Sequence, residues 1–243
     1  MLALKMREII KSISLYDDGI GQVEYIDHMG TDLTIVNAAR VSFGKHKEVF
    51  DEKDDKLLKY LIKHRHTSTL EHNNVTLRFT VPLFIRSQHH RHRTWSFNEI
   101  SRRYTDVDLQ FFETSKFRTQ HADNRQASNT SQVFNPIIDP EGISGGNAAN
   151  YLVHAHHKSS LRLYDRLIGA GICREQARGV LPQNLYTQYY GTVDLNNMIK
   201  FIKLRTHDGA QWEIQQVAMA CRQICSSLWP NAINALMEAE GLT

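Results

Sequence analysis

The 243-residue sequence lacks several features that would assign it to a protein class at once. It has only three cysteines, Cys173, Cys221 and Cys225, and they form no Cys-x-x-Cys pair, so neither a disulfide framework nor a thiolate zinc site is indicated. No apolar run approaches the roughly twenty residues that span a bilayer. Gly-x-Gly-x-x-Gly is also absent, which removes the usual fingerprint of a Rossmann nucleotide site.

Composition and charge are those of an ordinary globular protein. Hydrophobic residues make up 41% and charged residues 23%, which is typical of a single domain, 1–243, with a sizeable core. The net charge of +3 allows anionic ligands but does not by itself argue for DNA or RNA. The N-terminal residues Met1 to Glu8 are charged too early for a secretory signal. We therefore expect a cytoplasmic protein with no membrane partner.

The N-terminal half shows clear strand and helix patterns. Period-two alternation predicts strands at residues 23–27 and 74–81. A helix is predicted from Asp32, whose side chain would cap it, and another spans 51–64 with an apolar face. Pro82 is tolerated in a first turn and predicts a third helix.

The C-terminal half begins with a polar stretch. Residues 106–150 are rich in Asn, Ser, Gln, Asp and Gly, with turn signals at 139–142 and 145–147, and predict a surface excursion. Helical spacing and caps then predict helices at 149–170, 194–204 and 215–243, and a strand over 185–193 precedes the second of these.

Two groups of histidines invite a metal hypothesis. Zinc sites have a recognisable ligand spacing and a carboxylate around their ligands, and neither pattern occurs here. We therefore expect no metal, and we expect the second group to face solvent. The groups are His64, His66 and His72, and, on the helix at 149–170, His154, His156 and His157.

Residues 91–104 are the most unusual stretch. They contain four arginines, two serines, one asparagine and one glutamate among three aromatic residues. Guanidinium groups bind phosphate and carboxylate oxygens in a planar, two-pronged way. Glu99 could hold one arginine in place or accept hydrogen bonds from a sugar or a ring edge. A solvated helix face is the plain alternative, but no single helical stripe accounts for both the charged and the aromatic residues.

This stretch carries a family resemblance. Arg91-His92-Arg93, seven residues and then Ser101 resemble the Arg-His-Arg-(seven residues)-Ser signature of the flavin-dependent thymidylate synthases. The segment from His66 to His72 resembles the family's His-x-(Ser/Thr)-x-x-Glu-His segment. Stretches around Arg178 and at 205–214 resemble two further blocks in the same order. The resemblance implies the family's α+β fold, with a mixed or antiparallel sheet flanked by helices.

The resemblance also implies an activity, the reductive methylation of dUMP to dTMP. Methylenetetrahydrofolate would donate the carbon. FAD reduced by NADPH would carry the hydride, which side chains cannot donate. In the family the active site is shared between the subunits of a tetramer, so a homotetramer is implied. No nucleic-acid partner is implied.

Matched positions assign the site residue by residue. Arg205 is the expected catalytic residue, because its charge would stabilise negative charge on the N3/O4 edge of uracil as C5 becomes nucleophilic. Ser101 has the residue type of a nucleophile, but no base is placed to activate it, so it is assigned to binding. The expected dUMP ligands are Gln88, Arg91, Glu99, Ser101, Arg103, Arg178 and Arg205. The expected FAD ligands are His66, Ser68, Glu71, Arg91, His92, Arg93, Glu99 and Asn196.

The sequence departs from the family pattern at five positions, and two other function classes remain open. His89 and His90 replace more usual bulky residues and are given no role. Thr69 replaces a frequent proline, while Lys200 and Gly209 stand where a flavin-contacting asparagine and a histidine are common. A nucleic-acid-binding module would use residues 91–104 for phosphate contact and base stacking. A metal-dependent hydrolase would use the histidines. Neither alternative explains why four separated blocks match one family in order.

Overall fold

A computed structural model describes residues 8–125, 127–139 and 146–241. The N-terminal residues 1–7, on which the argument against a secretory signal rests, lie outside these ranges. Residues 140–145, which hold most of the predicted turn signals, do so too.

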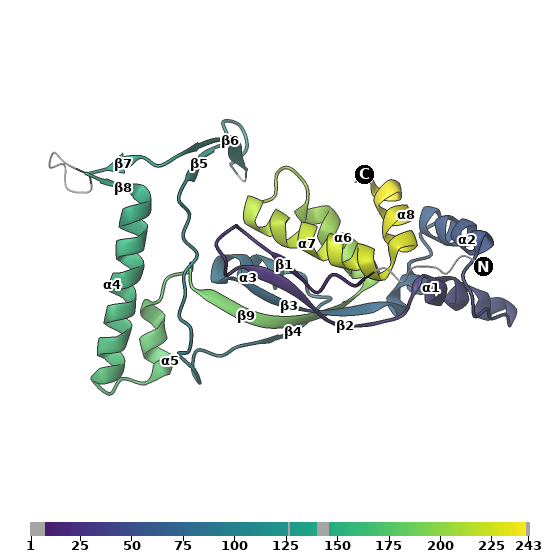
Figure 1. The fold of residues 1–243 in the computed structure, drawn as a ribbon, viewed down its shortest axis with the longest axis horizontal. Helices are drawn as coiled ribbons and strands as arrows, with labels where there is room; N and C mark the ends of the chain where they lie inside the picture. The colour runs from purple at the N-terminus through teal and green to yellow at the C-terminus, as the bar shows by residue number, and fades with distance from the viewer. Residues whose placement is uncertain (1–7, 126, 140–145, 242–243) are drawn as a thin grey trace.

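A five-stranded antiparallel sheet forms the centre of the molecule (Figure 1). It confirms the strands predicted at 23–27, 74–81 and 185–193 and the α+β fold class. Along the third strand, alternate side chains are buried, as expected of a sheet with one covered face. The strand order is β1 (Ser12–Ser14), β2 (Gln22–Met29), β3 (Asn74–Pro82), β9 (Tyr186–Asp194) and β4 (Ser96–Glu99).

Helices flank this sheet, and α6 and α7 lie along one of its faces (Figure 1). Their apolar sides meet the buried side of the sheet in one core that includes Phe79, Leu77, Phe201 and Trp229. The helices are α1 (Asp32–Arg40), α2 (Glu52–Lys63), α3 (Leu83–His89), α6 (Leu195–Arg205), α7 (Trp212–Leu228) and α8 (Pro230–Glu240). Short 3-10 turns lie at η1 (Val41–Phe43), η2 (Thr67–His72) and η3 (Arg178–Val180).

The prediction that Asp32 caps α1 was wrong. Thr31 is the N-cap residue, and its capping box is completed by Thr34. The Asp32 carboxylate instead accepts hydrogen bonds from the backbone N–H groups of Asn231, at 3.1 Å, and Ala232, at 3.0 Å. It therefore accepts the otherwise unpaired N–H groups at the start of α8, about 200 residues away. Spacing along the chain could not indicate this contact.

The prediction of one helix over 215–243 was also wrong, because the chain forms two helices there, α7 and α8. Proline has no backbone N–H and cannot continue a helix, but it fits the first turn of a new one. Pro230 accordingly begins α8, and the fully buried Trp229 forms the junction with α7.

The polar excursion at 106–150 contains paired strands. β5 (Phe117–Gln120) pairs with β6 (Ser128–Phe134), and β7 (Ile137–Ile138) pairs with β8 (Asn147–Ala148). They lead into α4 (Ala149–Gly169), which confirms the predicted helix and is followed by α5 (Arg174–Ala177). Figure 1 shows α4 at the opposite end of the molecule from α1 and α2.

The expectation that all three histidines of α4 face solvent was wrong for His157. That side chain is buried and its ring stacks on Phe111 with centroids 4.7 Å apart. Nδ1 of His157 and Nδ1 of His154 each lie 2.8 Å from an oxygen of Glu113. The carboxylate of Glu113, about 40 residues earlier in the chain, therefore provides the buried imidazole of His157 with a hydrogen-bond partner.

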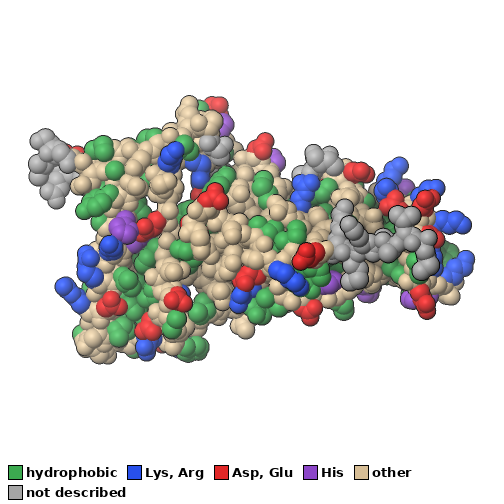
Figure 2. All heavy atoms as spheres, viewed as in Figure 1, with side chains coloured by type: hydrophobic (Ala, Val, Ile, Leu, Met, Phe, Trp, Pro, Cys, Tyr) green, Lys and Arg blue, Asp and Glu red, His purple; other side chains and the backbone are tan. Residues whose placement is uncertain are grey.

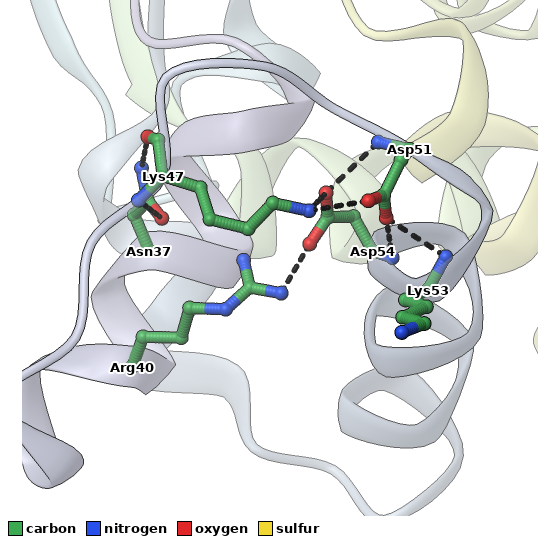
Figure 3. A network of polar contacts seen from close by, with 6 residues as sticks. All are labelled: Asn37, Arg40, Lys47, Asp51, Lys53 and Asp54. Atoms are coloured by element: carbon green, nitrogen blue, oxygen red, sulfur yellow. Dashed lines mark hydrogen bonds and ion pairs between the residues drawn. The ribbon is translucent and has the colours of Figure 1, made fainter.

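The loop between α1 and α2 is held by charged groups (Figure 3). Asp54 is fully buried, forms an ion pair with Arg40, and receives Nζ of Lys47 at 2.6 Å. Lys47 also reaches Asp51, the N-cap of α2, at 2.7 Å. Burial alone would raise the pKa of Asp54, but hydrogen bonds from Lys47, the Asp51 backbone and Arg40 outweigh it and lower the pKa to about 2.

The surface is mixed in charge. Figure 2 shows Lys and Arg side chains at both ends of the molecule, interspersed with Asp and Glu. None of the helices within the described ranges is both long and apolar enough to cross a membrane.

Candidate functional site

Arg205, at the C-terminal end of α6, is held by two residues of the α3 region. Its Nε donates to Nε2 of His92 at 3.0 Å, and Nη2 lies 3.5 Å from the backbone oxygen of Gln88. Burial and the charge of Arg205 lower the pKa of His92 to about 4. His92 is therefore neutral near pH 7 and can accept this hydrogen bond. Within the part of the chain that the structure describes, Nη1 of Arg205 has no hydrogen-bond partner.

The side chain of Gln88 is fixed next to Arg205. Its Nε2 donates to Oε1 of Gln211, the N-cap residue of α7. Three predicted site residues, Gln88, His92 and Arg205, thus come together from α3, the turn after it and α6. They form a compact polar cluster with one fixed positive charge.

The sequence offered no role for His89, which is fully buried beneath this cluster. Nδ1 of His89 lies 2.8 Å from the hydroxyl of Tyr189. Aromatic rings surround it, and burial lowers the pKa of His89 well below its ordinary value. The available signal was the aromatic content of residues 91–104, because these rings pack around this histidine. The rings within about 5 Å are Phe79, Trp95, Phe97 and Phe201.

Other predicted nucleotide ligands lie at a second place. Glu99, Ser101 and Arg178 line a cavity of about 530 Å³. Oε1 of Glu99 accepts a hydrogen bond from the hydroxyl of Thr187 at 2.7 Å and lies 3.2 Å from Nε of Arg86. Two roles were considered for Glu99, and its contact with Arg86 corresponds to the first, holding an arginine in place. A mixed arginine, serine and carboxylate lining suits a phosphorylated ligand.

Arg91, Arg93 and Arg103 are exposed, whereas Arg102 is half-buried and lines the cavity with Glu99. Arg103 pairs with Glu175 at 3.2 Å across an exposed surface. Arg91 and Arg93 make no side-chain hydrogen bond or ion pair with any residue that the structure describes. They are therefore available to a ligand or to another chain.

The seven predicted nucleotide ligands do not meet at one place on this chain. Arg86 faces Glu99 and the cavity, whereas Gln88, two positions later on α3, faces Gln211. Two positions along an α-helix correspond to a rotation of about 200°. No hydrogen bond or ion pair among the described residues joins the Arg205 cluster to the cavity residues.

A larger cavity, of about 670 Å³, lies between α2, η2, α6 and α8. His66 and Asn196, two predicted flavin ligands, line it, and Nδ2 of Asn196 donates to Oε1 of Glu71 at 3.2 Å. Ser68 lies on η2 and is exposed. His92, Arg93 and Glu99 do not line this cavity. Its cationic side chains are Lys59, Lys63, Arg65, Lys200 and Lys203.

A dinucleotide fits this cavity in both charge and chemistry. The lining carries more cations than carboxylates, which favours a diphosphate, and it offers amide and imidazole groups for hydrogen bonds. Lys200, one of the departures from the family pattern, is among the cations and donates to Oδ1 of Asn197 at 3.2 Å. At this position the substitution of lysine for asparagine adds positive charge to the cavity.

The His, Cys, Asp and Glu side chains within the described ranges do not form a metal site. No group of three or more His, Cys, Asp or Glu side chains there is arranged to hold a metal ion. Cys221 and Cys225 are buried, and burial raises the pKa of both thiols. Cys173 is exposed and free.

Three comparisons find the same kind of protein. The family model described as "Thymidylate synthase complementing protein" matches residues 24–231. A flavin-dependent thymidylate synthase of Thermus thermophilus is 39% identical over 218 residues, which cover 90% of this chain and 76% of that protein. That of Wolbachia pipientis wMel is 35% identical over 240 residues, covering 96% and 81%. The crystal structure of PolB, a UMP/dUMP methylase from Streptomyces cacaoi bound with 5-Br dUMP, superimposes with a TM-score of 0.75 at 30% identity, covering 93% of this chain and 97% of that one.

Proposed function

The chain belongs to the family of flavin-dependent thymidylate synthases and is an enzyme of that family, and from this premise we propose that it converts dUMP to dTMP by reductive methylation. Methylenetetrahydrofolate is the proposed carbon donor, and NADPH the proposed reductant of FAD. The observation that carries the proposal is the contact of Arg205 with His92 and Gln88, because it joins residues from separate matched blocks.

Arg205 is proposed to bind the uracil edge. C5 of uracil becomes nucleophilic when negative charge is delocalised over C5 and the N3/O4 edge of the ring, and this charge is consumed as C5 attacks the one-carbon unit. A guanidinium already held in place stabilises that charge without reorganising during the reaction. Because His92 is neutral, it fixes Nε of Arg205 without adding a competing charge.

FAD, when bound, supplies the hydride that no side chain can donate. The residues proposed to hold it are His66 and Asn196, with Glu71 positioning the asparagine amide. Lys200 and its cationic neighbours in the cavity would attract the diphosphate. The substitution of lysine at this position supports retention of an anionic cofactor.

We also propose that the nucleotide site is shared between subunits of a homotetramer. The predicted ligands form two groups, one around Arg205 and one in the cavity with Arg178. The apolar residues of α4 are only partly covered, and Leu163 is 47% exposed. A helix that leaves its apolar stripe in water needs a partner, and a second chain would cover α4 and bring the two groups together.

The nucleic-acid-binding alternative is not favoured by the geometry. Trp95 is only 6% exposed, and its ring packs against that of Phe97 with centroids 5.9 Å apart. Stacking on bases requires exposed ring faces. Of the three aromatic residues in this stretch, Tyr104 is the most exposed, at 78%.

The test of the proposed function has two stages. The purified protein should show flavin absorbance bands that bleach under anaerobic NADPH in the presence of dUMP. It should then transfer an isotopically labelled methylene carbon from the folate to dUMP. A colourless protein that cannot be reconstituted with FAD, or one that reduces flavin but forms no labelled dTMP, would refute the proposal.

A further inference from the structure

A chain of hydrogen bonds links the excursion at 106–150 to Gln88. Nη2 of Arg118, on β5, lies 2.7 and 2.9 Å from the two carboxylate oxygens of Glu213, a buried residue in the first turn of α7. Oε2 of Glu213 accepts a hydrogen bond from Nε2 of Gln211 at 2.9 Å. Oε1 of Gln211 in turn accepts from Nε2 of Gln88.

The carboxylate at one end determines how both amides point. An ionised carboxylate accepts hydrogen bonds and donates none, so Gln211 must turn its NH2 group toward Glu213. Its carbonyl oxygen then faces Gln88, which must turn its own NH2 group toward Gln211. Reversing Gln211 would place its oxygen against the carboxylate of Glu213, and reversing Gln88 alone would place its oxygen against that of Gln211. Burial makes such unpaired contacts costly.

Gln88 consequently presents its carbonyl oxygen away from Gln211. No residue in the described part of the chain donates a hydrogen bond to Oε1 of Gln88. Arg205, whose Nη2 lies 3.5 Å from the Gln88 backbone oxygen, stands beside it as a donor. The site thus offers one fixed acceptor next to one fixed donor.

This pair matches the imide edge of uracil. In uracil the ring N3 carries a hydrogen and is flanked by carbonyl oxygens, whereas in cytosine N3 carries none and accepts a hydrogen bond. We propose that Arg118, Glu213 and Gln211 orient the amide of Gln88 so that it accepts from the N3–H of the base, which selects uracil over cytosine. The inference rests on the proposed function and names the residues that determine its choice of base.

Arg118 keeps the carboxylate of Glu213 in place. Its Nε donates to Oγ of Ser128, on the paired strand β6, at 2.8 Å. Its guanidinium carbon also lies 5.5 Å from the ring centroid of Trp212, the first residue of α7. The β5–β6 pair does not contact Gln88 directly. It therefore influences the orientation of the Gln88 amide through the buried carboxylate of Glu213. Arg118, Glu213 and Gln211 are positioning residues in this scheme, and Gln88 is the residue that touches the base.

The test measures the dissociation constants of dUMP and dCMP by calorimetry on the flavin-loaded protein. Wild-type protein is expected to prefer dUMP by about tenfold or more, as sites built around a substrate N–H do. Glu213→Gln allows Gln211 to turn either way, so the preference should fall several-fold, mainly through tighter dCMP binding. Gln88→Met removes the acceptor and should lose the preference.

The control is Glu24→Gln, which neutralises another carboxylate held by two nitrogens of one arginine, Arg78, in the central sheet. It should leave the dUMP to dCMP ratio unchanged. If Glu213→Gln melts like wild type and keeps the wild-type ratio, the inference is overturned while the proposed function stands. If wild-type protein binds neither nucleotide, the proposed function fails and the inference fails with it.

Discussion

The proposed chemistry depends most on Arg205, because its guanidinium contacts two other predicted site residues, His92 and Gln88. It is partly buried, and burial lowers its pKa, but an arginine remains charged at any physiological pH. Its hydrogen bond to a neutral imidazole leaves this positive charge uncompensated. An uncompensated, fixed charge is what stabilisation of a developing anion requires.

Replacing Arg205 by alanine is expected to abolish dTMP formation, with a loss of at least about a hundredfold in turnover, because the stabilising charge is removed. Flavin content should stay at the wild-type level, since Arg205 does not line the larger cavity. Turnover and flavin absorbance, measured on the same preparation, check both parts. Turnover equal to wild type would refute the assigned role.

Because the pKa of His92 is lowered in the folded protein, we expect the free energy of unfolding to depend on pH. Burial and Arg205 lower its pKa from 6.5 to about 4 in the folded protein. As pH falls from 6.5 toward 4, the unfolded chain takes up a proton that the folded chain does not, so the free energy of unfolding decreases across this window. Urea denaturation at several pH values should show a shallower decrease for His92→Gln than for wild type. Parallel curves would contradict this explanation.

Among the elements, the α1–α2 loop depends on one buried carboxylate. Asp54 holds Arg40 and Lys47 while also completing the capping box of α2 with Asp51. β2, β3, β9 and most helices needed no such contact to be predicted, because side-chain periodicity reports them directly. By contrast, the backbone N–H groups at the start of α8 donate to the carboxylate of Asp32, which is distant in sequence.

Replacing Asp54 by asparagine should lower the free energy of unfolding by about 3 kcal/mol, because it leaves two cations without their shared buried partner. Thermal melting of the variant against wild type measures the loss. Asp55→Asn, next to it in α2, removes only a more exposed pair with Lys59 and serves as the control. Equal melting temperatures for the two variants would show that the network does not stabilise this loop.

At the scale of the whole molecule, the predicted nucleotide ligands are divided between the Arg205 cluster and the cavity with Arg178. A sheet whose outer face keeps exposed side chains such as Tyr190, together with the partly covered α4, leaves surface for other copies of the chain. The proposed tetramer would complete the site with residues of different subunits.

Mixing two inactive variants tests this sharing. Arg178→Ala and Arg205→Ala are each expected to be inactive alone. Refolded together at equal amounts, they should regain about one quarter of wild-type activity, because that fraction of shared sites receives both arginines. Light scattering should give the mass of four chains. A mixture that stays inactive while forming tetramers would mean that each site uses both arginines of one chain.

The sequence by itself determined three strands of the central sheet, most helices and the family, because periodicity and short motifs are local and are written in consecutive residues. It also named Arg205, Gln88 and His92 as site residues. Only the tertiary structure decided which of them touch, that His89 is buried under them, and that Arg118 is linked to Gln88 through Glu213 and Gln211. Those contacts join residues about a hundred positions apart. Packing chooses such partners, and no spacing along the chain encodes them.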